Sequence, residues 1–181
     1  MIRFLFPFSA LVIACLAFSG CTTAPRSDEG RTDLRNDAGR ALAKAEKHDP
    51  SLAEALRSAA GYAVFPSVGK AAAGVGGAYG KGVLYDSDSM VGYCDLTQAS
   101  IGLQLGGQNY TEIICFENEA ALKKFQSGDF ALDAQTSAVA IESGVGANAR
   151  YSDGVKVFTT DEEGMMIEAS VGGQKFAYQP F

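Results

Sequence analysis

Few side chains of this sequence could carry acid–base or metal chemistry. His48 is the only histidine, so a His-based triad could be built there alone, and a zinc site would also need cysteines and carboxylates. Asp95, Glu112 and Glu168 lie within or beside apolar stretches, where carboxyl groups are usually solvent-facing or hydrogen-bonded rather than paired for catalysis. We therefore expect no enzyme, no metal site and no cofactor.

A glycine-rich run between residues 74 and 85 could suggest a phosphate-binding loop. The spacing does not fit, because a G-x-G-x-x-G pattern begun at Gly74 meets Tyr79 at its sixth position, and a P-loop would need Lys and Ser or Thr directly after Gly74. The small residues instead alternate with larger ones, at Gly74, Gly76, Ala78, Gly80 and Gly82. We expect a bare strand face that a backbone, a helix or a ligand approaches closely, or a sharp bend of the sheet.

The first twenty residues are typical of a bacterial export signal. Arg3 supplies the positive start, residues 4–20 are uncharged, and small residues precede Cys21. This stretch is shorter than the roughly 20 apolar residues of a membrane span and contains Pro7. Phe18-Ser19-Gly20-Cys21 resembles the lipobox of bacterial lipoproteins, which implies lipidation of Cys21 after removal of residues 1–20. An ordinary secretory signal cleaved nearby is the alternative.

Two cysteines remain once the signal and the lipidation site are set aside. Cys94 and Cys115 lie in apolar stretches, and an envelope compartment would permit a disulfide between them. Buried thiols are equally compatible with that setting, because the sequence does not fix the distance between the two residues.

The composition argues against several partners. The chain of 181 residues has a formal net charge of −6 and no basic run longer than Lys123-Lys124, which argues against nucleic acid and against a polybasic membrane patch. Residues 21–35 are polar and are expected to form a flexible tether from Cys21. Residues 36–181 are expected to form a single domain, which at this size needs no disulfide or metal to fold.

Helical patterns occur in three places. Apolar residues recur at helical spacing over residues 34–48, and Pro50 disfavours continuation of that helix. Asp49 can cap a second helix that has Pro50 at its first position and stops at Gly61. Asn118 can cap a third helix that ends at Gly128.

Strand patterns fill the rest of the domain. Alternation predicts strands over residues 74–85, 97–105 and 110–116, with Gly106-Gly107 as a hairpin turn between the last two. Further strands are expected over residues 136–141, 155–160, 165–171 and 174–178. Because glycine-containing turns separate most of them, antiparallel pairing is expected. The fold class is α+β, with amino-terminal helices packed on a glycine-rich, mainly antiparallel sheet or partly closed barrel.

The motifs from Gly61 onward resemble a known family. Gly61-Tyr-Ala-Val-Phe-Pro66, Gly74-Val-Gly-Gly-Ala-Tyr-Gly80, the stretch from Leu96 through Gln108, and Val157-Phe-Thr-Thr160 are similar to the SYLF domain. The resemblance covers most of the chain after the signal. It implies a lipid-binding module, since eukaryotic members bind phosphoinositides and yeast members also bind and bundle actin. An exported bacterial lipoprotein does not meet actin, so an actin partner is not expected.

The first hypothesis is a non-enzymatic lipid-binding module on an envelope-anchored lipoprotein. Thr22, where Asp would favour the inner membrane, implies by resemblance to Gram-negative sorting rules an outer-membrane lipoprotein that faces the periplasm. The candidate lipid-binding residues are the cations and glycines around the bare strand face: Lys70, Lys81, Arg57, Gly74, Gly76 and Gly80. The alternative is a structural lipoprotein that binds another envelope protein or a cell-wall component.

Overall fold

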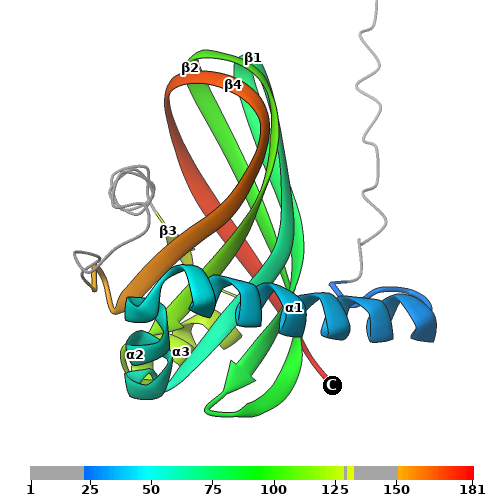
Figure 1. Ribbon diagram of the computed structural model, residues 1–181, viewed down its shortest axis with the longest axis vertical. Helices are drawn as coiled ribbons and strands as arrows, with labels where there is room; N and C mark the ends of the chain where they lie inside the picture. The colour runs from blue at the N-terminus through cyan, green and yellow to red at the C-terminus, as the bar shows by residue number, and fades with distance from the viewer. Residues whose placement is uncertain (1–22, 129, 133–150) are drawn as a thin grey trace, which may run out of the picture.

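The computed structural model describes residues 23–128, 130–132 and 151–181, and at residues 103–104 and 161–172 it describes the backbone alone. The elements follow one another as α1 (Asp28–His48), α2 (Pro50–Ser58), β1 (Gly61–Asp86), β2 (Ser89–Phe116), α3 (Glu119–Gln126), β3 (Ala131–Leu132) and β4 (Val155–Pro180). The strands form one antiparallel sheet in the order β1-β2-β4-β3. The three long strands bend over together at one end, so that the sheet curls on itself (Figure 1). The predicted α+β class with a curled antiparallel sheet is confirmed.

The two amino-terminal helices form where local signals predicted them. Asp49 accepts a hydrogen bond from the backbone N–H of Ser51 and so caps α2, with Pro50 at the first helical position. The start of α1 differs from expectation. This helix begins at Asp28, where the side chain of Ser27 accepts a hydrogen bond from the N–H of Gly30, so the expected tether over residues 21–35 is wrong from residue 28 onward.

The chain before α1 is also part of the folded domain. Thr23 and Ala24 are both buried, and the N–H of Ala24 donates a hydrogen bond to Oε1 of Gln179 near the other end of the chain. The expected signal sequence over residues 1–20 and the lipidation site Cys21 lie outside the described residues. Thr23, the first described residue, is two positions after Cys21 in the sequence.

β1 and β2 form one long hairpin. Asp86 pairs with Ser89 across a turn at Ser87, whose φ of 54° is in the left-handed region. Gly106 and Gly107 do not form the predicted hairpin turn, because β2 continues through both. The register shifts just before these glycines, between the pairs Val75↔Ile101 and Ala73↔Leu105, where β2 advances by four residues while β1 advances by two. Gly74, with a φ of 77°, provides the matching bend in β1.

The carboxy-terminal part of the sheet is simpler than predicted. The expected strands over residues 155–160, 165–171 and 174–178 are one continuous strand, β4, which pairs with β2 along its length. The strand expected over residues 136–141 lies outside the described residues. The third helix is confirmed as α3, and the side chain of Asn118 accepts a hydrogen bond from the N–H of Ala121.

Apolar side chains pack on both faces of the curled sheet. The inner cluster contains five phenylalanines whose ring centroids lie 4.9–6.1 Å apart, and α3 closes it at one end. These rings belong to Phe65, Phe116, Phe125, Phe130 and Phe176. The outer cluster lies beneath α1 and α2, where Ala38, Ala45 and Leu52 meet the stacked rings of Tyr62 and Tyr85. Because alanine side chains are small, an alanine-rich helix can approach a sheet closely, and α1 and α2 pack on the sheet in this way.

The two remaining cysteines are free thiols. Cys94 belongs to the inner cluster and Cys115 to the outer one, although both come from β2. They form no disulfide with each other, because they lie on opposite faces of the same sheet. The sequence had left open whether the two residues form a disulfide or remain buried thiols. Burial raises the pKa of both thiols, that of Cys115 to about 12, although Lys156 opposes this shift for Cys115.

Among the described residues, no helix has both the length and the apolar composition that a membrane crossing would require.

Candidate functional site

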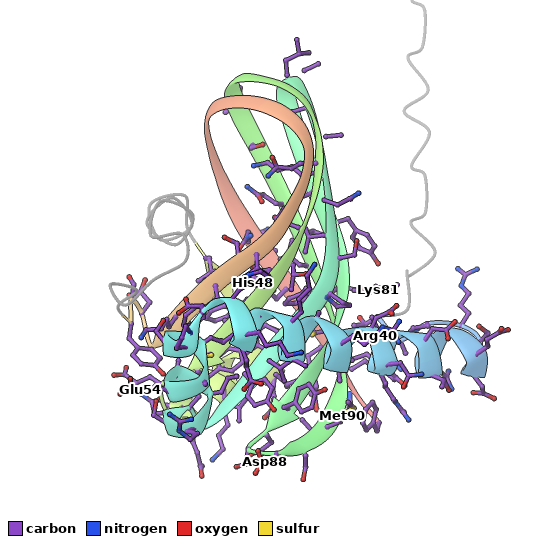
Figure 2. All side chains as sticks on the ribbon, viewed as in Figure 1. Arg40, His48, Glu54, Lys81, Asp88 and Met90 are labelled. Atoms are coloured by element: carbon purple, nitrogen blue, oxygen red, sulfur yellow. The ribbon has the colours of Figure 1, made fainter. Side chains whose placement is uncertain are left out.

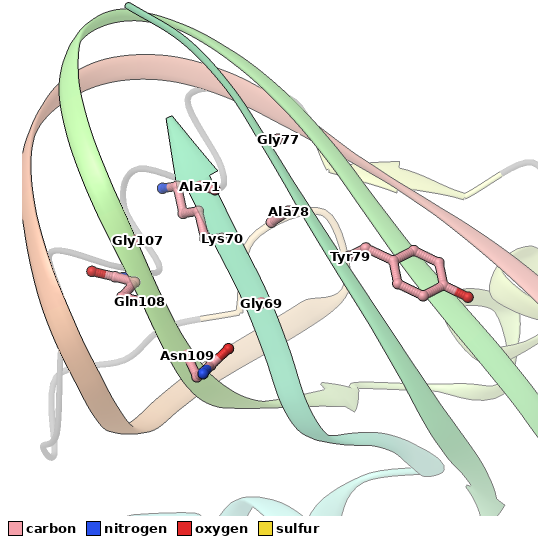
Figure 3. A pocket seen from close by; sticks show the side chains of 9 residues that line it. All are labelled: Gly69, Lys70, Ala71, Gly77, Ala78, Tyr79, Gly107, Gln108 and Asn109. Atoms are coloured by element: carbon pink, nitrogen blue, oxygen red, sulfur yellow. The ribbon is translucent and has the colours of Figure 1, made fainter. Parts of the chain in front are cut away.

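An open cavity lies between the two halves of β1. Its volume is about 680 Å³. It is lined by three residues from each of three neighbouring stretches, namely Gly69, Lys70 and Ala71 on the outgoing half of β1, Gly77, Ala78 and Tyr79 on the returning half, and Gly107, Gln108 and Asn109 on β2 (Figure 3). Most of these residues are glycine or alanine, so backbone and methyl groups form much of the wall.

The cavity exists because the two halves of β1 touch at one end and separate towards the bend. A Cβ atom on Gly82 would lie 2.5 Å from the carbonyl oxygen of Val64, and one on Gly80 would lie 2.8 Å from Cγ2 of Val68. The predicted close approach to the glycine face is therefore confirmed, and the approaching backbone belongs to β1 itself. Beyond Gly80 the halves diverge around the cavity (Figure 3).

A β-bulge places Lys70 among the cavity residues. Between the register pairs Phe65↔Glu112 and Val68↔Tyr110, β1 advances three residues while β2 advances two. One extra residue reverses which face the following side chains occupy, so Val68 lies in the same inner cluster as Phe65 and Lys70 follows it two residues later. Thr111 helps to hold the bulge, because its hydroxyl donates a hydrogen bond to the carbonyl oxygen of Pro66. Lys70 is 5% exposed.

A buried polar group lies behind the cavity. Glu112 is 1% exposed, and its Oε2 accepts a hydrogen bond of 3.0 Å from Nε2 of Gln174. Burial raises the pKa of Glu112 to about 7, although the hydrogen bond from Gln174 and the positive charge of Lys70 both oppose the shift. Oε1 of Glu112 and Oε1 of Gln98 accept no hydrogen bond from the described protein atoms. The interior of the sheet next to the cavity therefore contains polar groups, and its charge depends on whether Glu112 is protonated.

Of the candidate lipid-binding residues, only Lys70 lines the cavity. Gly80 contacts the outgoing half of β1, Gly74 forms the bend, and Gly76 lies just beyond it. Lys81 lies on the outer face, where its Nζ is 3.2 Å from Oδ1 of Asp95 (Figure 2). Arg57 is exposed on α2, away from the cavity. The three β2 residues of the wall were missed as site residues, because only the strand register places them beside Lys70.

The carboxylates singled out from the sequence have structural partners where they are described. Asp95 pairs with Lys81, Glu112 bonds Gln174, and the side chain of Glu168 lies outside the described part. His48 is exposed at the end of α1 (Figure 2). Within the described residues no cluster of three histidine, cysteine or carboxylate side chains could hold a metal ion.

Comparisons with known proteins find two similarities. Residues 97–179, most of β2 through β4, match the Ysc84 family model, which is described as Las17-binding protein actin regulator. Beta cell expansion factor A of Aeromonas veronii is 26% identical to the chain over 149 residues, which is 82% of this chain and 57% of that protein. The chain thus spans little more than half the length of this relative. No solved structure matches the chain. With the sequence motifs, the Ysc84 match over residues 97–179 and the similarity to this relative support the resemblance of the chain to the SYLF family.

Proposed function

We propose that this protein is a non-enzymatic lipid-binding module of a bacterial lipoprotein, anchored through Cys21 to the outer membrane and facing the periplasm. The observation that carries the lipid-binding part is the cavity between the halves of β1, in which a nearly buried cation, Lys70, stands beside walls of glycine and alanine. The sequence Phe18-Ser19-Gly20-Cys21 carries the anchoring part.

The cavity has the size and chemistry for part of an anionic amphiphile. Ligand pockets of small molecules commonly measure about 300–1,000 Å³, and the cavity of about 680 Å³ falls within that range. Methyl and backbone groups at Gly69, Ala71 and Ala78 suit an alkyl chain, while Lys70 suits a phosphate or carboxylate. Gln108 and Asn109 add hydrogen-bonding groups at the same wall.

Lipid binding by the domain would have a purpose other than localisation. Two or more acyl chains hold a protein stably on a bilayer, at about 0.8 kcal/mol per buried methylene group. An anchored domain therefore gains little residence time from a second lipid contact. We propose that the cavity selects or holds a lipid presented by the membrane to which the protein is attached.

Native mass spectrometry tests the cavity directly. The chain from Thr23 to Phe181, incubated with vesicles of phosphatidylethanolamine and phosphatidylglycerol and then separated from them, is expected to carry phospholipid. Lys70→Gln should lose the anionic lipid selectively, while Lys175→Gln, which removes an exposed cation outside the cavity, should retain it. Thermal unfolding of each variant establishes that it is folded. Wild-type protein that stays free of lipid in this assay would count against lipid binding and in favour of a structural lipoprotein that contacts another envelope component.

A further inference from the structure

The bend of the sheet exposes large apolar side chains at the end opposite α2 and α3 (Figure 1). Val75 is 69% exposed, Ile101 is 68% exposed and Leu105 is 66% exposed. Val75 and Ile101 are direct partners across β1 and β2, so their side chains share one face. Tyr79, 45% exposed, lies four residues after Val75 in the same strand and thus on that face too.

This end of the hairpin also lacks charge. β1 contains no charged residue from Ala71 to Gly80, and β2 contains none from Leu96 to Thr111. In β4 the register puts Val171 opposite Ile101 and Ile167 opposite Leu105, with Glu168 as the one acidic residue from 165 to 174. Soluble surfaces usually intersperse charges among exposed apolar side chains, so a bent end with several large apolar side chains and one acidic residue marks an interaction site.

The position of Thr23 indicates which partner this end meets. Nζ of Lys81 donates a hydrogen bond of 2.8 Å to the carbonyl oxygen of Thr23. Lys81 lies two residues after Tyr79 and six after Val75 in the same strand, with no bulge recorded between Val75 and Leu84, so all three side chains share the outer face. The start of the described chain is therefore fixed on the face that carries Val75, Tyr79 and Ile101.

From this geometry we infer that the outer face around Val75, Tyr79 and Ile101 lies against the bilayer, with the apolar bend in the headgroup region. The inference rests on the lipid anchor at Cys21 proposed above. Two residues span at most about 7 Å, so an acylated Cys21 holds Thr23 close to the lipid surface. Val75, six residues from Lys81, is then about 20 Å along the strand from the anchor point, within reach of the same surface.

This orientation also relates the cavity to the lipid. Tyr79 both borders the cavity and lies on the outer face with Val75, so one wall of the cavity belongs to a strand segment whose outer face meets the bilayer. The bilayer is thus the partner of the bend.

Single tryptophans test the orientation, because the chain contains none. Val75→Trp and Ile101→Trp place reporters at the bend, and Ser89→Trp places a matched exposed control in the β1–β2 turn at the opposite end. Each lipidated full-length mature protein is reconstituted into vesicles of phosphatidylethanolamine and phosphatidylglycerol whose acyl chains carry bromine. Excitation at the red edge of the tryptophan band avoids the tyrosines.

The bend reporters are expected to show blue-shifted emission that the brominated chains quench, and the Ser89→Trp reporter is expected to show neither effect. Flotation and palmitate labelling of the same samples report separately on the anchor. Vesicle-bound protein with unquenched reporters at both bend positions would overturn the orientation while leaving the anchor intact. Dimers in which a second copy shields the bend would also overturn the orientation. Unlabelled protein that fails to float would overturn the anchor and, with it, the orientation.

Discussion

The ammonium group of Lys81 holds the carbonyl oxygen of Thr23 at 2.8 Å and the carboxylate of Asp95 at 3.2 Å. The side chain of Lys81, in β1, thus fixes Thr23 at the start of the described chain to the sheet. Arg35 adds a second contact nearby, with its guanidinium 4.5 Å from the ring centroid of Phe181. The segment before α1 is therefore a part of the domain.

We expect Lys81→Met to loosen this segment and to destabilise the fold. Asp95 has a side chain only 9% exposed, so loss of its cationic partner should cost about 1–3 kcal/mol. Urea unfolding measures the loss, and hydrogen exchange at Ala24 should become faster. Lys175→Met, which removes an exposed cation elsewhere on the sheet, serves as the control. Unchanged exchange at Ala24 would show that Lys81 does not hold the segment.

Glu112 should make the stability of the protein depend on pH. Its folded-state pKa is raised from 4.5 to about 7, so the folded state binds the proton more tightly than the unfolded state does. The corresponding stability is fully present below about pH 4.5 and is lost as the pH rises through about 7, with a total of about 3 kcal/mol.

Glu112→Gln tests this dependence, because the amide is nearly isosteric and stays neutral. Urea unfolding at several pH values should show the wild type losing stability relative to the variant between about pH 4.5 and 7. Other carboxyl groups contribute equally to both proteins, so the difference isolates Glu112. Two parallel curves would show that Glu112 is not protonated preferentially in the folded state.

Gly82 should tolerate no side chain. A Cβ there would lie 2.5 Å from the carbonyl oxygen of Val64 and 2.7 Å from Cδ1 of Phe65, so Gly82→Ala must push the two halves of β1 apart. Overpacking of this kind costs about 1–3 kcal/mol. Gly39→Ala is the matched control, because nothing lies within 4 Å of a Cβ at that helical position, and it should stabilise α1 by about 0.5–1 kcal/mol. Equal melting temperatures for the two variants would contradict the close contact.

Cys94 and Cys115 should remain reduced thiols in protein purified under oxidising conditions. Both are buried and their pKa values are raised, so a thiol reagent should modify them only after the protein unfolds. Titration with such a reagent, with and without denaturant, measures this. A peptide that links the two residues in an unreduced digest would contradict the arrangement on opposite faces.

The anchor predicts lipid attachment at a single cysteine. Labelled palmitate should enter the wild-type protein in a bacterial host, and Cys21→Ala should abolish the incorporation. Cys15→Ala alters the other amino-terminal cysteine and should leave labelling unchanged, since Cys15 would leave with the signal. Persistent labelling of the Cys21→Ala protein would refute the assignment.

Local sequence signals determined the parts of the fold whose cause lies within a few residues. Asp49 with Pro50, and Asn118, predicted two helix starts correctly because a cap acts on backbone N–H groups two or three residues away. The alternation of glycine with larger residues predicted a close backbone approach, since only a missing Cβ permits one. Motifs in order along the chain also gave the resemblance to the SYLF domain that the Ysc84 match over residues 97–179 supports.

Tertiary structure decided what depends on distant partners. Residues 23–33 offered no apolar periodicity, and the placement of Thr23 and Ala24 depends on Lys81 and Gln179, residues far along the chain. Gly106-Gly107 suits a turn or a continuous strand equally, and pairing with two flanking strands selected the strand.

The side of the sheet on which Lys70 lies was decided by one extra residue in the bulge before Val68. Because the side-chain period of a strand is two, a single added residue exchanges the inner and outer faces for everything that follows. The sequence determined that Lys70 and Lys81 lie close to the glycine-rich stretch. The bulge and the curl of the sheet decided that Lys70 lines the cavity and that Lys81 binds Thr23 at the start of the described chain.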